Sequence, residues 1–125
     1  MFKFEKLDVW QKAVEYTDLV YKVTQAFPSE ERYGLTSQLR CSAVSVSSNI
    51  AEGASRSSET DFARFIEIAY GSLLESVSEL EVARRQGFLS QDSFRQVYEG
   101  AETVARQLSA FRRTLRNFKP SALSS

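Results

Sequence analysis

Apolar residues recur at intervals of three and four along four stretches of the chain, the spacing of one face of an α-helix. The pattern is clearest in the third stretch, whose apolar face comprises Phe62, Phe65, Ile66, Ala69, Leu73, Ser76, Val77, Leu80 and Ala83. The fourth stretch repeats it with Phe94, Val97, Ala101, Val104, Leu108, Phe111 and Leu115. The spacing predicts helices over about 9–27, 33–52, 59–86 and 91–117.

Residues that start or stop helices lie at the ends of these stretches. The first helix is expected to begin at an Asp8 cap and to stop at Pro28. Gly53 is expected to end the second helix and Gly87 to follow the third, since glycine is common just beyond a helix end. The expected caps of the third and fourth helices are Ser57 or Ser58, and Ser90.

Short loops between amphipathic helices place consecutive helices antiparallel and adjacent. The chain has 125 residues with only 5 Gly and 2 Pro, which disfavours a many-turned β architecture. We therefore predict an all-α protein, an antiparallel up-down-up-down four-helix bundle. Residues 1–118 form its single domain, and residues 119–125 are expected to be a flexible tail.

The second helix is rich in small residues, which allow neighbouring helices to pack closely against it. Helical geometry puts Asn49 in the core stripe with Leu35, Leu39, Ser42, Val46 and Gly53. A buried amide needs partners, so we expect Asn49 to bond to another helix or to the following loop. Gly71 lies away from the core stripe of the third helix, where a close packing contact would explain it. Helix faces that point away from the core and still suit close packing predict self-association.

Several chemistries lack the residues they need. The chain has no histidine and one cysteine, Cys41, so an intrachain disulfide, a Glu-x-x-His dimetal site and a zinc site are excluded. Cys41 is expected to be a buried, unreactive thiol. Glu75 and Glu79 could hold a hard cation with Glu52, or form a solvated or arginine-paired surface. We expect no cofactor.

Two further hypotheses concern charged side chains. An enzymatic one would use Glu52, Glu75 and Arg56 in a polar pocket, although structural ion pairs commonly give the same arrangement. Net charge is zero and the sequence pI is 6.3, so no overall basic field attracts nucleic acid. Basic residues do gather near the C-terminus, where they either complement a helix dipole or bind nucleic acid: Arg106, Arg112, Arg113, Arg116 and Lys119.

No apolar run is long enough to span a bilayer, and charges interrupt the N-terminal segment MFKFEKLDVW. We therefore expect a cytoplasmic protein that does not use a membrane as a partner.

Three motifs, FEKLDVWQKA, FPSEERYGLTSQLRCSAVSVSSNIAEG and IAYGSLLE, carry a family resemblance. In this order, they resemble the four-helix-bundle proteins encoded in intervening sequences of 23S ribosomal RNA genes. The resemblance runs from Phe4 to about Phe118. Related accessory variability determinant proteins of diversity-generating retroelements share this fold.

This resemblance implies a non-enzymatic bundle that assembles into a ring-like homopentamer and acts as a binding scaffold for a partner protein or nucleic acid. The alternative it implies is a nucleic-acid-binding accessory protein that cooperates with a reverse transcriptase or with rRNA. The motif residues are Trp10, Gly34, Leu35, Gln38, Arg40, Ser45, Asn49, Ile50, Glu52, Gly53, Arg56, Gly71, Ser72 and Glu75. Where the family commonly has two consecutive arginines, this chain has Arg40 and Cys41, which removes one basic group.

Overall fold

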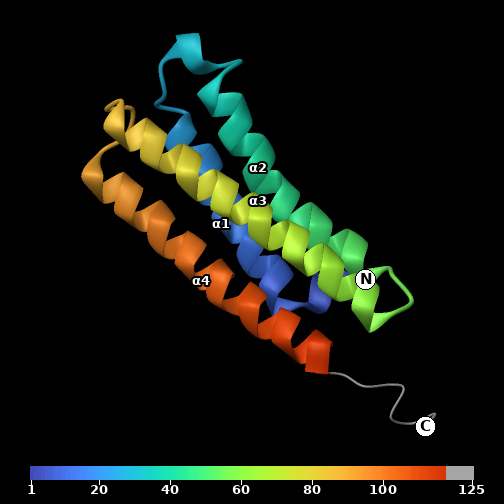
Figure 1. The fold of residues 1–125 in the computed structure, drawn as a ribbon. Helices are drawn as coiled ribbons and strands as arrows, with labels where there is room; N and C mark the ends of the chain where they lie inside the picture. Colours follow the sequence, from blue (N-terminus) through green and yellow to red (C-terminus); the bar gives the residue numbers. More distant parts are fainter. Residues whose placement is uncertain (118–125) are drawn as a thin grey trace, which may run out of the picture.

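The computed structural model describes residues 1–117 and contains four long helices and no strand over that range. Figure 1 shows consecutive helices running antiparallel in one bundle, in which α1 contacts α2 and α4, and α3 contacts the same two helices. The elements are η1 (Lys3–Lys6), α1 (Asp8–Thr24), η2 (Ser29–Glu31), α2 (Leu35–Ala54), α3 (Glu59–Arg85) and α4 (Gln91–Asn117). The predicted all-α class is confirmed. The predicted tail, 119–125, lies outside the described residues.

Most helix ends lie where the sequence predicts them. The Asp61 backbone N–H donates to Ser58 Oγ over 3.0 Å, and the Ser93 N–H donates to Ser90 Oγ over 3.1 Å, so both serines cap their helices. Gly87 has a φ of +78° and ends α3. The Phe88 N–H bonds back to the Ala83 carbonyl over 3.0 Å, a pairing that satisfies one of the last carbonyls of the helix.

The predicted roles of Asp8 and Gly53 are wrong. Asp8 is the first residue of α1, the cap position is Leu7, and no side chain caps that end. The Asp8 carboxylate instead lies in the first turn, where the helix dipole favours a negative charge. Gly53 lies inside α2, which continues to Ala54. Its backbone conformation does not require glycine, because its φ is not positive.

The core is built from small and branched side chains of all four helices. Tyr16 is the largest fully buried side chain, and its hydroxyl shares a 2.7 Å hydrogen bond with Ser76 Oγ across from α1 to α3. Burial raises the pKa of Tyr16 to about 12. Fully buried apolar residues include Ala13, Val20, Leu39, Val46, Ile50, Ile66, Leu73, Leu80, Val97 and Leu108.

Gly53 is required by the close approach of α2 to the start of α3. A Cβ atom at this position would lie 2.6 Å from Phe65 Cβ and 2.9 Å from Phe62 Cδ1. Because Phe65 Cβ is fixed to the backbone of α3, it cannot move without moving the helix. The absence of a side chain at Gly53 therefore sets how closely α2 and α3 pack at this end of the bundle.

We expect Gly53→Ala to lower the free energy of unfolding by about 1–3 kcal/mol, because the added methyl group overpacks the contact. Urea denaturation monitored by circular dichroism measures this. The control is Gly100→Ala, also inside a helix, where the added Cβ would lie 3.1 Å from the movable Leu19 Cδ1 and in ordinary van der Waals contact, at 3.6 Å, with Tyr16 Cδ1. It should be neutral or stabilising, and an equal loss in both variants would contradict the packing role of Gly53.

Candidate functional site on the face of α2 and α3

Polar side chains link α2 to α3 along the length of their contact. Ser42 Oγ donates to Glu79 Oε1 over 2.7 Å. Two turns of α3 away, Ser45 Oγ and Ser72 Oγ lie 2.9 Å apart and share a hydrogen bond. Serine side chains are short enough for the helices to pack closely while each hydroxyl still finds a partner.

Asn49 lies at the edge of this polar contact rather than in the core. Its side chain is half-buried, and Nδ2 donates to the Ser45 carbonyl and to Ser45 Oγ, over 2.8 and 3.0 Å. The predicted bond of Asn49 to another helix or to the following loop is therefore wrong. The amide binds one turn back on its own helix and orients Ser45, and Ser45 carries the link to Ser72.

Glu79 is the carboxylate most perturbed by this contact. Burial raises the pKa of Glu79, the hydrogen bond from Ser42 partly opposes the rise, and the nearby charge of Glu75 adds to it. The ionised carboxylate is thus held in a less favourable setting than in water, with one neutral donor as compensation.

Glu52 and Arg56 form an ion pair with each other, which is the structural alternative to an enzymatic role. Arg56 donates to Glu52 Oε2 over 2.9 Å, and its guanidinium lies 4.6 Å from the centre of the Phe65 ring. Both side chains are largely exposed. Within residues 1–117 no three Asp, Glu or Cys side chains come together as a metal site, so Glu52, Glu75 and Glu79 do not converge.

Arg40 lies in a groove over the first half of α2. Its Nε donates to Thr24 Oγ1 over 2.8 Å, and its guanidinium lies 4.6 Å from the centre of the Tyr21 ring. The groove has a volume of about 700 Å³. We call it the basic groove and define it by Tyr21, Arg32, Tyr33, Arg40, Cys41 and Val44.

Cys41 and the two tyrosines give this groove an accessible surface. Cys41 is exposed, so its predicted burial is wrong. It lies on the side of α2 opposite the core, because the core side is taken by Leu39, Ala43 and Val46. Tyr33 is 89% exposed, with the Arg32 guanidinium 6.0 Å from its ring centre.

The outer side of α3 carries exposed apolar side chains around Gly71. Ile68 is 46% exposed, Leu74 50% and Val82 47%. Gly71 is itself exposed, and a Cβ added there would have nothing within 4 Å among residues 1–117 apart from its chain neighbours and the backbone of its own helix. The predicted packing contact of Gly71 is therefore not made among the residues that the structure describes. We call Ile68, Gly71, Leu74, Glu75, Ser78 and Val82 the outer stripe.

The basic residues of α4 do not form one continuous surface. Arg116 donates to Glu67 Oε1 over 2.7 Å, and Arg112 is half-buried with its guanidinium 5.9 Å from the centre of the Tyr70 ring. Arg106 and Arg113 are exposed on the outer side of α4. Lys119 lies outside the described residues. Contacts with α3 therefore occupy two of the four described arginines of this predicted cluster.

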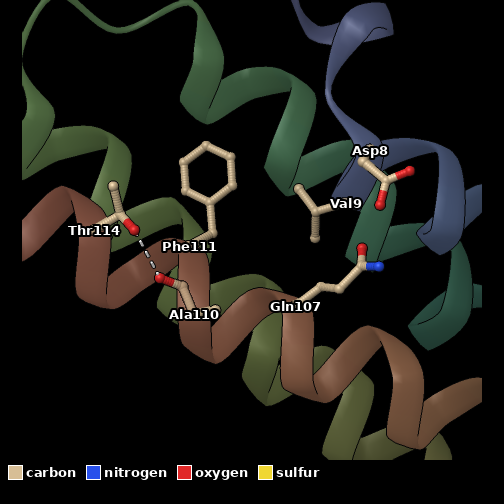
Figure 2. Close-up of a pocket in the computed structure, with 6 residues that line it drawn as sticks. All are labelled: Asp8, Val9, Gln107, Ala110, Phe111 and Thr114. Carbon is tan, nitrogen blue, oxygen red and sulfur yellow. Dashed lines mark hydrogen bonds between the residues drawn. The ribbon is translucent and has the colours of Figure 1, made fainter.

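A cleft of about 430 Å³ between the start of α1 and the second half of α4 was not anticipated from the sequence (Figure 2). Its lining is Asp8, Val9, Gln107, Ala110, Phe111 and Thr114. Gln107 Oε1 is buried and has no hydrogen-bond partner among the described residues. Thr114 Oγ1 donates to the Ala110 carbonyl over 3.1 Å and so is not free to serve Gln107.

Other contributors to the site were not predicted from the sequence either. Tyr21, Thr24, Arg32 and Tyr33 complete the groove around Arg40, but they come from the end of α1 and the loop before α2. Only the antiparallel packing of α1 on α2 brings them together. The outer stripe did leave a signal, because Ile68, Gly71 and Val82 lie off the main apolar face of their helix.

Together these features define an all-helical four-helix protein. Its accessible functional groups lie on the outer surface, in a basic groove on α2 and an apolar stripe on α3. None of the described helices is long and apolar enough to cross a membrane.

The chain belongs to the family of 23S rRNA-intervening sequence proteins, whose family model matches residues 5–110. It is similar to the crystal structure of a protein of unknown function from the S23 ribosomal protein family of Bacteroides thetaiotaomicron VPI-5482. That match has 19% sequence identity and a TM-score of 0.76, and covers 83% of this chain and 97% of that one, so it shows the fold alone. No curated protein matches the chain. The relation to accessory variability determinant proteins stays a prediction.

We expect Glu79→Gln to raise the free energy of unfolding at pH 7 but not below about pH 4. Since folding raises the pKa of Glu79 above its ordinary 4.5, the folded state binds the proton more tightly than the unfolded chain. The resulting loss of stability is present when the carboxylate is ionised and vanishes below pH 4.5. The amide introduced by the substitution still offers an oxygen to Ser42.

Thermal melts at pH 7 and pH 4 measure the effect. Glu99→Gln, the same substitution on an exposed position of α4, is the control and should leave the melting temperature nearly unchanged. A gain for Glu79→Gln that is equal at both pH values would contradict the burial of this charge.

Proposed function

We propose that this protein is a non-enzymatic, homo-oligomeric scaffold that associates through the outer stripe of α3. The observation that carries the proposal is the exposure of Ile68, Leu74 and Val82, each close to half exposed, along one side of one helix. Removing apolar surface of this kind from water is worth roughly 25 cal/mol per Å². A neighbouring chain that covers the stripe would gain this free energy.

Gly71 supports the same surface. A glycine inside a helix costs about 1 kcal/mol relative to alanine. Among residues 1–117 nothing packs into the space, since apart from the adjacent residues and the backbone of its own helix no atom lies within 4 Å of where its Cβ would be. A second chain that packs against α3 at Gly71 would use it, because the missing side chain lets two helices approach closely.

The number of copies that we propose is five, in a ring. The exposed stripe supports association as such, and the number comes from the family resemblance. In this assembly the scaffold would present repeated copies of its remaining surfaces to a partner protein or a nucleic acid.

We expect light scattering on a sizing column to give a mass near 71 kDa, five times the 14.2 kDa of one chain. Ile68→Asp should shift the mass toward that of one chain, because it places a charge in the buried contact. Gln96→Asp, on an exposed position of α4, is the matched control and should leave the mass unchanged. A wild-type mass of 14.2 kDa at every concentration would refute self-association.

A second candidate function is binding of RNA or DNA by the outer side of α4. Arg106 and Arg113 favour it, since they lie seven residues apart on the same side of the helix. Neither has a carboxylate within 4 Å in residues 1–117. Two guanidinium groups spaced along one exposed helix face can reach successive phosphates.

For this candidate we expect binding of structured RNA or duplex DNA that weakens as salt rises, because phosphate contacts release counterions. The double substitution Arg106→Gln and Arg113→Gln should reduce both the affinity and the salt slope. Arg56→Gln, which removes a guanidinium paired with Glu52, is the control. Fluorescence anisotropy measures all three, and no binding at low salt, or binding without salt dependence, would exclude this function.

A further inference from the structure

We infer that the outer stripe of one copy docks into the basic groove of another, with Glu75 of the stripe facing Arg40 and Arg32 of the groove. This inference rests on the proposed self-association and names the two surfaces that meet. Three observations support it: the spacing of the residues in the stripe, the fixed position of the Arg40 guanidinium in the groove, and the opposite charges of the two surfaces.

The outer stripe has the pattern of a helix-packing surface. Ile68, Gly71, Glu75, Ser78 and Val82 follow one another at alternating intervals of three and four residues. This is the spacing of positions that meet a partner helix. Apolar side chains occupy both ends, small residues lie between them, and Glu75 stands at the centre.

Glu75 is the exception in this pattern. It is exposed, and none of the basic groups in residues 1–117 lies within 4 Å of its carboxylate. A carboxylate that is covered by a partner helix must gain a cation or hydrogen-bond donors, since its desolvation is otherwise costly. A docking surface for the stripe therefore needs a positive group near its centre, with apolar and small side chains around it.

The basic groove supplies that positive group in a fixed position. The bond from Arg40 Nε to Thr24 Oγ1 and the contact with the Tyr21 ring hold the guanidinium in place. No hydrogen bond within the described residues uses the two terminal nitrogens of Arg40, which leaves them for another acceptor. Arg32 adds a second guanidinium, and neither arginine has a carboxylate within 4 Å in the described part of the chain.

The remaining lining of the groove matches the rest of the stripe. Ser37, Cys41, Val44 and Ser48 line it from α2 and follow the same alternating spacing of four and three. At 1.5 Å of rise per residue, this row is about 16 Å long, and the stripe from Ile68 to Val82 is about 21 Å long. The two rows are of similar length, and both carry small side chains that allow a close helix–helix approach.

No carboxylate lines the groove, and the stripe between Ile68 and Val82 contains no Lys or Arg. Charge complementarity therefore favours the pairing of groove with stripe over the pairing of either surface with itself. Two grooves face to face would bring arginines together, and two stripes would bring Glu75 carboxylates together.

The test is charge reversal with rescue, read as the mass and the dissociation constant of the assembly by light scattering and sedimentation. Glu75→Arg alone and Arg40→Glu alone should each raise the dissociation constant by about a hundredfold or more, because each places like charges in contact. The double variant should regain most of the wild-type affinity. Glu99→Arg, a reversal on an exposed position of α4, is the matched control and should leave association unchanged.

Arg40 also contacts Thr24 and Tyr21, so Arg40→Glu could unfold the chain. Arg32→Glu, on an exposed residue beside η2, repeats the reversal without those contacts, and circular dichroism verifies the fold. If the wild type is monomeric, the proposed function itself fails. If the wild type assembles but Glu75→Arg and Arg32→Glu do not weaken assembly, this pairing is overturned while self-association stands. Groove variants that lose binding of an acidic peptide or of phosphate, with assembly intact, overturn it as well.

Discussion

The close approach of α2 to α3 is the constraint on which the rest of this molecule depends. Gly53 lets α2 lie against the Phe62 and Phe65 side chains, and serines occupy the positions along the contact where larger side chains would hold the helices apart. Close packing of polar side chains is stable only if their hydrogen bonds are made inside the contact. Ser42, Ser45 and their partners meet that condition. These hydrogen-bonded side chains, which we call the polar seam, replace part of the apolar core between the two helices.

Because the polar seam holds α2 and α3 together on their facing sides, the outward sides of these two helices are available to bind a partner. Because α2 and α3 pack side by side, the sides that they turn away from the core lie next to each other and form one broad face. The side chains on this face contribute little to the core. This face carries both the basic groove and the outer stripe. The family motif residues Arg40 and Gly71 lie on it, whereas Asn49 orients the seam beneath it and Gly53 closes the seam at one end. Packing within residues 1–117 explains Gly53 and Asn49 but gives Gly71 no packing partner.

The fold could be predicted from the sequence because periodicity and helix-end residues act locally. Ser58, Ser90 and Gly87 fulfil their expected roles, since each acts on its own helix end. The sequence predicts the wrong role for Gly53, because a glycine near a helix end can either end that helix or allow a second helix to approach closely. Only the position of Phe65 on another helix decides between these two roles. Cys41 was misassigned because the sequence defines which residues share a side of α2 but not how many sides are covered. The groove could not be predicted, since it joins the end of α1 to α2.

Charge distribution explains why a nearly neutral protein can still have a specific surface. Arg112 and Arg116 are occupied by contacts with α3, and Arg56 is occupied by Glu52, so these cations serve the fold. Arg40 differs, because its stacking on Tyr21 and its bond to Thr24 hold the guanidinium but do not neutralise it. Holding a cation in place without a counter-charge removes side-chain freedom before any partner arrives, which lowers the entropy lost on binding. Arg40 is thus preorganised toward the outside of the bundle, which is the physical property expected of a binding residue rather than a core residue.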